Sequence, residues 1–134
     1  MSIETPSGDS SDIDRLIRSL KDKPNSGLIF LPDAITGARR VQITALVMEC
    51  RLPAIYPLRL FTEVGGLMSY GVKVDKIYAG AASYVDLILR GANPAELPVQ
   101  APTEFEFVVN QKTAGQLGLQ LSPLLLASAD EVIE

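Results

Sequence analysis

Residues 27–33 read GLIFLPD, a run of four apolar residues that ends abruptly at a proline and a carboxylate. A half-buried strand alternates apolar and polar side chains, whereas residues 28–31 are apolar at every position. Strands without a polar face are typical of parallel sheets that helices cover on both sides. The run therefore predicts an inner strand of an α/β domain, with Asp33 at its carboxyl end.

Helical and extended patterns alternate along the rest of the chain. Apolar residues at helical spacing predict helices over residues 11–22, 36–49 and 73–90. Further extended segments are predicted at residues 53–57, 67–71 and 104–109, the last alternating acidic and aromatic residues. A strand, a helix and a second strand within about 30 residues form a βαβ unit, which closes with a right-handed crossover. The pattern indicates a mostly parallel sheet flanked by helices.

Turn and cap signals complete this outline. Three prolines make residues 91–103 a connector, Asn110 can cap a short helix that Gly118 closes, and Ser122-Pro123 suits the start of a final helix. A chain of 134 residues fits one domain, which we place at residues 10–134. Residues 1–9 are rich in Ser, Asp, Gly and Pro, and we expect them to be disordered.

Composition excludes several classes of function. The chain has no histidine, which removes Ser/His/Asp and Cys/His catalysis and the commonest transition-metal ligand. Its net charge is −4 without a Lys/Arg-rich run, which argues against binding nucleic acid. Cys50 is the single cysteine, so no internal disulfide forms. We expect no metal ion and no cofactor.

Asp33 is the first candidate for a binding site, because ligands of open parallel sheets bind beyond the carboxyl ends of the strands. A carboxylate there suits an ammonium or hydroxyl group of a small molecule. Thr36 begins the next helix, whose exposed N–H groups share this polar spot, so Thr36 is a candidate ligand contact as well. Asp33 is equally placed to cap that helix. Tyr56 ends the second strand at the same edge, where it either contacts a ligand or belongs to the core. The residues alone leave these alternatives open.

Ser69 and Tyr70 stand between glycines and are the remaining candidates. They could line a cleft, or Gly65, Gly66 and Gly71 could simply permit a tight chain reversal. An enzyme with Asp33 as nucleophile or base is a weaker alternative. A receiver-like phosphate acceptor needs further acids to hold magnesium, and none stands at the end of a preceding strand.

Several stretches together resemble the ABC-transporter substrate-binding proteins, specifically their tryptophan/tyrosine-binding-like group with the type I periplasmic binding protein fold. They are GLIFLPD, RLPAIYP, GGLMSYG, YVDLILRGANPAELPVQAPTEFEFVVNQKTAGQLGL and LLLASADEVIE, in this order. The resemblance covers about residues 12–134 and corresponds to the last two-fifths of such a protein.

The resemblance implies a non-catalytic protein with two α/β lobes, a hinge of three crossovers and a small ligand, typically an amino acid, in the cleft. By position it implies that Asp33 and Tyr56 fall where the second lobe faces the cleft. Ser69 and Tyr70 fall where the chain returns toward the first lobe. Family members hand their ligand to a permease and are typically periplasmic or lipid-anchored. Residues 1–14 here lack the basic and apolar regions of a signal peptide, so the compartment stays open.

The fold class expected is therefore a partial type I periplasmic-binding-protein, Rossmann-like lobe. An apolar parallel strand needs neighbours at both edges, and nothing in residues 1–26 offers one. We expect a second copy to complete the sheet, in a symmetric homodimer with exchanged elements or a sheet shared between chains. The function expected is binding of a small solute for an ABC importer. The alternative is a ligand-sensing or regulatory domain of the same fold that acts through oligomerisation.

Overall fold

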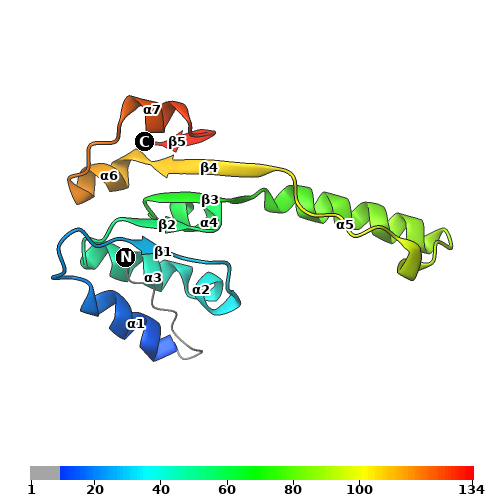
Figure 1. Ribbon diagram of the computed structural model, residues 1–134, viewed down its shortest axis with the longest axis horizontal. Helices are drawn as coiled ribbons and strands as arrows, with labels where there is room; N and C mark the ends of the chain where they lie inside the picture. Colours follow the sequence, from blue (N-terminus) through cyan, green and yellow to red (C-terminus); the bar gives the residue numbers. More distant parts are fainter. Residues whose placement is uncertain (1–9) are drawn as a thin grey trace.

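The computed structural model describes residues 10–134, so the expected disorder of residues 1–9 lies outside the described residues. Figure 1 shows five strands in one sheet, helices packed beside them, and one long helix that projects away. The helices are Ser10–Ser19 (α1), Ala34–Ala38 (α2), Arg40–Glu49 (α3), Arg59–Glu63 (α4), Val74–Leu89 (α5), Gln111–Leu117 (α6) and Pro123–Ala127 (α7), with a 3-10 turn at Pro94–Glu96 (η1). The strands are Leu28–Ile29 (β1), Ala54–Tyr56 (β2), Met68–Val72 (β3), Phe105–Asn110 (β4) and Glu131–Ile133 (β5).

The sheet has the order β1-β2-β3-β4-β5. The β1–β2, β2–β3 and β4–β5 pairs are parallel, and only β3 and β4 run antiparallel within the described residues. This confirms the prediction of an α/β domain with a mostly parallel sheet flanked by helices. The antiparallel pair arises because α5 and its connector carry the chain out beyond the sheet and back (Figure 1).

The fifth strand was not predicted. Three residues are too few to show the alternation by which a strand is found in a sequence. An ion pair of Glu131 helps to hold β5 at the edge of the sheet. Arg59 of α4 lies 3.1 Å from the Glu131 carboxylate and 3.3 Å from that of Glu106 on β4. One guanidinium thus joins β4, β5 and α4, a contact between residues distant in sequence.

The hydrophobic core lies on one face of the sheet. Tyr56 of β2 packs there with Ile43 and Val47 of α3 and with Phe61 of α4. Helix α1 also belongs to this layer and contributes Ile17, whose surface is 2% exposed. The buried members of the cluster are Ile17, Ile43, Leu46, Val47, Cys50, Leu52, Ala54, Tyr56 and Phe61. Cys50 is therefore a buried packing residue.

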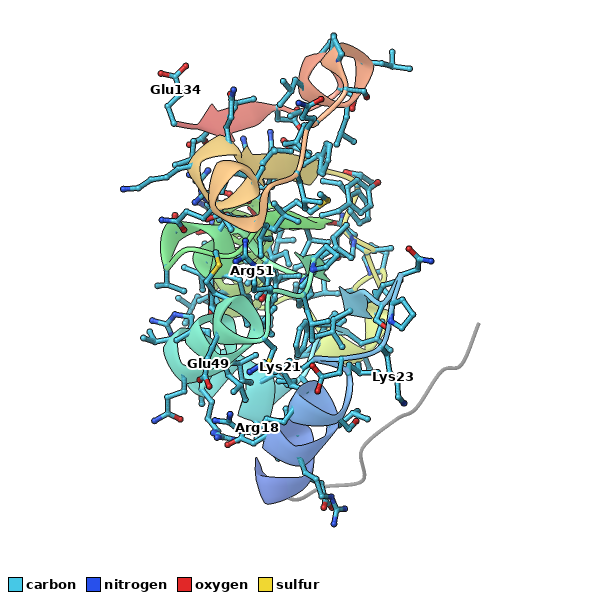
Figure 2. All side chains as sticks on the ribbon, turned by 90° about the vertical axis from the view of Figure 1, so that its left-hand side faces the viewer. Arg18, Lys21, Lys23, Glu49, Arg51 and Glu134 are labelled. Atoms are coloured by element: carbon cyan, nitrogen blue, oxygen red, sulfur yellow. The ribbon has the colours of Figure 1, made fainter. Side chains whose placement is uncertain are left out.

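Ion pairs hold α1 against α3 at the edge of this layer. Arg18 lies 3.1 Å from Glu49, and both side chains appear together at the foot of the molecule in Figure 2. Arg39 donates two hydrogen bonds of 3.0 Å to the Asp14 carboxylate. Exposed pairs contribute at most about 1 kcal/mol each. They orient α1, while burial of Ile17 supplies most of its anchoring.

The opposite face of the sheet corrects one prediction. Strand β1 was expected to be covered on both sides, yet Ile29 is 72% exposed and Leu31 is 70% exposed. On the same face, Tyr70 of β3 is 57% exposed. Apolar residues at every position indicate that a strand favours cover on both faces, but they do not supply the covering element. Among residues 10–134, helices cover one face of β1 only.

The prediction of one helix over residues 36–49 is corrected too, because the structure has two helices there. They are α2 and α3, and they meet at Arg39, whose φ of −96° and ψ of 14° depart from helical values. Gly37 lowers the helix propensity just before this break. The Arg40 guanidinium donates to the Gly37 carbonyl across it, at 3.3 Å. Local propensity accounts for the break, which apolar spacing alone did not reveal.

Helix α5 agrees with the prediction of residues 73–90 to within one residue at each end. It leaves the sheet after β3, and residues 90–104 run back along it to β4 (Figure 1). Gly91, with φ of +98°, ends the helix as expected for a C-terminal glycine. No residue of α5 is buried by the part of the chain that the structure describes. Within residues 10–134, no helix combines the length and apolarity needed to cross a membrane.

Candidate functional site

Three chain segments converge on the carboxyl edge of the parallel strands. Asp33 follows β1, the turn at Pro57 and Leu58 follows β2, and α5 begins just after β3. Because these three strands are parallel, their carboxyl ends meet at the same edge of the sheet. In Figure 1 this edge faces the projecting α5. Open parallel sheets bind ligands at this edge.

Asp33 caps α2, which agrees with the capping interpretation of this residue. Its Oδ1 accepts hydrogen bonds of 2.9 Å from the backbone N–H groups of Ile35 and Thr36. The Thr36 hydroxyl in turn donates to the Asp33 carbonyl at 3.1 Å. The two residues therefore form one local unit, in which Thr36 is buried and Asp33 is exposed. Its exposure keeps the Asp33 carboxylate accessible to a ligand.

Two substitutions of Asp33 distinguish the stability that comes from its capping hydrogen bonds from any effect of its charge. We expect Asp33→Ala to lower the free energy of unfolding by about 1 kcal/mol, because two backbone N–H groups lose their acceptor. Asp33→Asn keeps an acceptor oxygen, so its stability should stay within about 0.5 kcal/mol of the wild type. Urea unfolding followed by circular dichroism measures both. Equal losses in the two variants would contradict the capping role.

Tyr56 lies in the core, 2% exposed. Its ring is stacked between Phe30 and Phe61, with centroids 4.9 and 4.8 Å away and planes within 11°. Both faces of the ring are therefore occupied by the protein's own aromatic residues. Burial also raises the pKa of the Tyr56 hydroxyl well above its ordinary value. The structure places this residue beneath the carboxyl edge and not at its surface.

Ser69 and Tyr70 are neighbours on β3, but their side chains lie on opposite faces of the sheet. Ser69 is 1% exposed, and its Oγ has no hydrogen-bond partner among the described residues. Tyr70 is largely exposed, and its ring stacks on Phe105 of β4 at 5.9 Å. Of the five predicted site residues, Asp33 and Tyr70 present exposed side chains, whereas Thr36, Tyr56 and Ser69 are buried.

The glycines around these residues support the chain-reversal interpretation as well. Gly65 has a backbone φ of +101°, in the left-handed region that residues other than glycine rarely adopt. Gly66 packs so closely that an added Cβ would lie 2.8 Å from the Phe61 carbonyl and from the Tyr56 ring. The two sequence interpretations are therefore compatible, because the glycines set the turn that positions β3.

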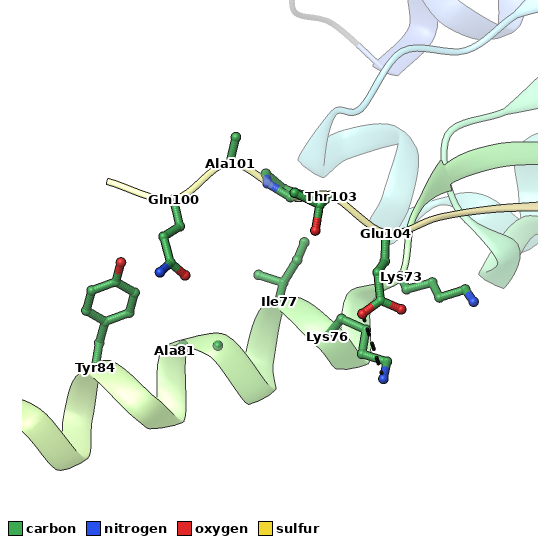
Figure 3. A pocket seen from close by; sticks show the side chains of 11 residues that line it. Lys73, Lys76, Ile77, Ala81, Tyr84, Gln100, Ala101, Thr103 and Glu104 are labelled. Atoms are coloured by element: carbon green, nitrogen blue, oxygen red, sulfur yellow. Dashed lines mark ion pairs between the residues drawn. The ribbon is translucent and has the colours of Figure 1, made fainter. Parts of the chain in front are cut away.

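A cavity of about 330 Å³ lies beside this edge, between α5 and the connector to β4. Figure 3 shows Gln100 and Thr103 projecting from the connector toward the helix, with Thr103 above Ile77 and Gln100 near Tyr84. At the end nearer the sheet, Lys76 lies 3.9 Å from Glu104. The volume is at the lower end of the range for small-molecule pockets.

None of the five predicted residues lines this cavity. Both walls of the cavity mix apolar and polar residues. The helix contributes Ile77 and Ala81 beside Lys76, and the connector contributes Gln100 and Thr103 beside Pro102. The opposite end is closed by Tyr84, whose hydroxyl donates to the Pro98 carbonyl. Sequence reasoning found both elements but not their contact, because a proline-rich connector shows no periodicity that would reveal which face of α5 it follows. Among the described residues, no group of acidic, cysteine or histidine side chains is arranged to hold a metal ion.

A mostly parallel sheet with polar groups at its carboxyl edge defines the class of α/β domains that commonly bind small molecules. The chain belongs to the family of ABC transporter substrate binding proteins, whose model matches residues 3–133. This confirms the resemblance found in the sequence. It also confirms that the protein is not an enzyme, because the family binds its substrate without catalysis.

Three solved structures share the fold. A conserved domain protein from Vibrio cholerae O1 biovar El Tor has a TM-score of 0.86 at 24% identity, over 97% of this chain and 44% of that one. An ABC domain in complex with L-Trp from Streptococcus pneumoniae has a TM-score of 0.81 at 22% identity, over 92% and 41%. A ligand-free, open substrate binding protein with adhesive properties from Clostridium difficile has a TM-score of 0.63 at 19% identity, over 98% and 43%.

The chain therefore spans less than half the length of each of these structures. No curated protein sequence matches it. At these identities the likeness establishes a shared fold, over nearly the whole of this chain.

Proposed function

We propose that this chain is the solute-binding component of an ABC-type import system. In this proposal it binds a small molecule such as an amino acid at the carboxyl edge of its sheet and passes it to an ABC permease. The family match over residues 3–133 carries the proposal. The fold shared with a protein that holds L-Trp supports an amino acid as the class of solute.

The exposed residues of the edge supply the chemistry that an amino acid needs. The Asp33 carboxylate suits the ammonium group of the ligand, and the largely exposed ring of Tyr70 offers an aromatic face to its side chain. Thr36 holds Asp33 in place through its backbone N–H. Ser69 and Tyr56 are buried beneath the edge, so we assign them the role of positioning the residues that contact the ligand.

Calorimetry and thermal unfolding with L-Trp, followed by a panel of the other amino acids, test this proposal. At a ligand concentration of ten times Kd, binding adds about 1.4 kcal/mol of stability. For a domain of this size the expected rise in Tm is roughly 3–6 °C. Asp33→Asn should weaken binding at least about tenfold, with the Tm of the ligand-free protein unchanged.

Asp86→Asn is the matched control, because it removes an exposed carboxylate on α5, and it should bind ligand as the wild type does. A flat response of the wild-type chain to every amino acid would refute binding by this chain. Equal affinity in the wild type and in Asp33→Asn would refute the role of Asp33 alone.

We further propose that the chain works as a homodimer, which also keeps open the alternative of a ligand-sensing, regulatory domain. Exposed apolar residues on α5 and on the bare sheet face favour contact with a second copy, which the regulatory alternative requires. Sedimentation with and without L-Trp separates the two functions. A change of more than about tenfold in the dimer dissociation constant supports regulation through assembly. An unchanged constant supports a simple carrier.

A further inference from the structure

A second, much smaller cavity lies inside the domain, where α3, β2, the Gly65-Gly66 turn and α6 meet. Its polar side chains are those of Thr44, Tyr56 and Thr113, and the rest of its wall is mostly apolar. Its volume of about 10 Å³ is close to that of one water-sized sphere, about 10–15 Å³. The cavity therefore has room for one water molecule and for no larger solute.

The Thr44 hydroxyl is the unsatisfied polar group of this cavity. Thr44 is 3% exposed, and its Oγ1 has no direct hydrogen-bond partner among the described residues. A threonine inside a helix can donate its hydroxyl to a carbonyl three or four residues earlier, as Thr62 does to the Arg59 carbonyl at 2.7 Å. Thr44 lacks such a bond within the described chain. Because an unpaired buried hydroxyl is costly, a partner is expected in the cavity that Thr44 lines.

The Tyr56 hydroxyl lies near Thr44 in the same cavity. Burial raises the pKa of Tyr56, and the neighbouring Thr44 hydroxyl lowers it, so the two groups are close enough to interact. They are nevertheless not placed for a direct hydrogen bond. Polar groups that face each other without a direct bond are commonly joined by water. A hydroxyl both donates and accepts, so one water molecule can satisfy both residues.

The third hydroxyl of the cavity belongs to Thr113 of α6. It donates to the Gly65 carbonyl at 3.0 Å, and its oxygen can still accept a hydrogen bond. Buried water molecules typically make about three hydrogen bonds. Three hydroxyls around a space of this size thus match the needs of one water molecule. The remaining unpaired hydroxyl of the described chain, that of Ser69, lines neither this cavity nor the one beside α5.

We propose that this cavity is a binding site for one structural water molecule, which bridges the hydroxyls of Thr44 and Tyr56 and donates to Thr113. The water joins α3, β2 and α6, and it anchors the Tyr56 ring at the end that its aromatic neighbours do not hold. This inference concerns the core of the described lobe. It stands whether or not the chain binds the proposed solute.

A crystal structure of the wild-type chain, at a resolution that shows ordered water, tests the site directly. One water oxygen is expected about 2.5–3.0 Å from both Thr44 Oγ1 and Tyr56 Oη. A cavity without water density, or a direct hydrogen bond between the two hydroxyls, overturns the proposal.

Thermal unfolding of Thr44→Val tests the site in solution. Valine has nearly the shape of threonine and a similar helix propensity, so the variant removes the hydroxyl and little else. If the water satisfies this hydroxyl, Tm should fall by about 2–5 °C, the shift expected for one lost hydrogen bond in a domain of this size. If the hydroxyl is unpaired, its removal should raise Tm instead. A Tm that is unchanged or higher therefore overturns the bridge.

Thr62→Val is the matched control, because Thr62 is 0% exposed, bonds directly to the protein and lies outside the cavity. Its Tm should fall by a similar amount, but its crystal structure should keep the water that Thr44→Val displaces. Loss of the water from both variants would contradict a specific role of Thr44.

A double variant tests whether Thr44 and Tyr56 share the same water. The Tm losses of Thr44→Val and Tyr56→Phe should be less than additive when the two are combined, because residues with a common partner are coupled. Strictly additive losses would show that the two hydroxyls have separate partners and would exclude the bridge.

Discussion

Replacing Gly71 by alanine is expected to unfold most of the domain. A Cβ at Gly71 would lie 1.7 Å from the Pro57 carbonyl oxygen and 2.8 Å from its carbonyl carbon. Both are main-chain atoms, so rotation of a side chain cannot relieve the clash. Strand β3 would have to move away from the turn that joins β2 to α4. We expect a loss of more than about 4 kcal/mol, which is a large part of the 5–15 kcal/mol that stabilises an ordinary domain.

Gly80→Ala is the matched control for this change. Gly80 lies within α5, and nothing is within 4 Å of the position of its Cβ. Alanine there should raise stability by about 0.5–1 kcal/mol, because it removes the flexibility of glycine from a helix interior. Guanidinium unfolding followed by circular dichroism compares the two variants. A Gly71→Ala protein within about 1 kcal/mol of the wild type would show that β3 does not approach Pro57 this closely.

Truncating Tyr56 to alanine should have the second-largest effect. The variant opens a cavity between Phe30 and Phe61 and should cost about 3–5 kcal/mol. Tyr56→Phe keeps the three-ring stack and should cost less than about 1.5 kcal/mol. Denaturant unfolding measures both, and calorimetry with L-Trp should show that Tyr56→Phe binds within about threefold of the wild type.

The Tyr56→Phe result distinguishes the two interpretations of this residue. Unchanged stability with a large loss of affinity would show that the hydroxyl contacts the ligand. Tyr56→Ala with near-native stability would show that the ring is not part of the core.

The same tyrosine makes stability depend on pH at the alkaline end. Burial raises the pKa of Tyr56 in the folded state above its ordinary value of 10.0. Its contribution to stability is therefore complete below about pH 10 and is lost as pH rises further, because the unfolded state ionises first. The Tyr56→Phe variant lacks this contribution and should lose less stability than the wild type between pH 10 and 12. Parallel pH profiles of the two proteins would contradict burial of the hydroxyl.

The candidate site was predictable from sequence in part. Asp33 was placed at the carboxyl end of a strand from the apolar run before it, and the structure shows it there, capping α2. What Tyr56 contacts could not be predicted, because Phe30 and Phe61 reach it from different elements. The cavity beside α5 could not be predicted either, since it depends on the path of a connector without periodicity.

Local signals in the sequence determined most element boundaries. Asn110 caps α6, Gly118 ends it at φ of +74°, and Ser122 caps α7, each as expected. A cap depends on hydrogen bonds within four residues, so the residues that form it stand next to one another in the chain. The apolar run at residues 28–31 likewise predicted a strand, and the structure has β1 at Leu28–Ile29 within it.

Tertiary structure alone decided which surfaces are covered. The bare face at Ile29, the ion pair between Arg59 and Glu131, and the close approach of Gly71 to Pro57 all depend on segments that are distant in sequence. The exposed side of α5 has the same origin, because its apolar spacing indicates that it packs but not against what. An apolar residue records a preference for burial, and only the folded chain shows whether that preference is met.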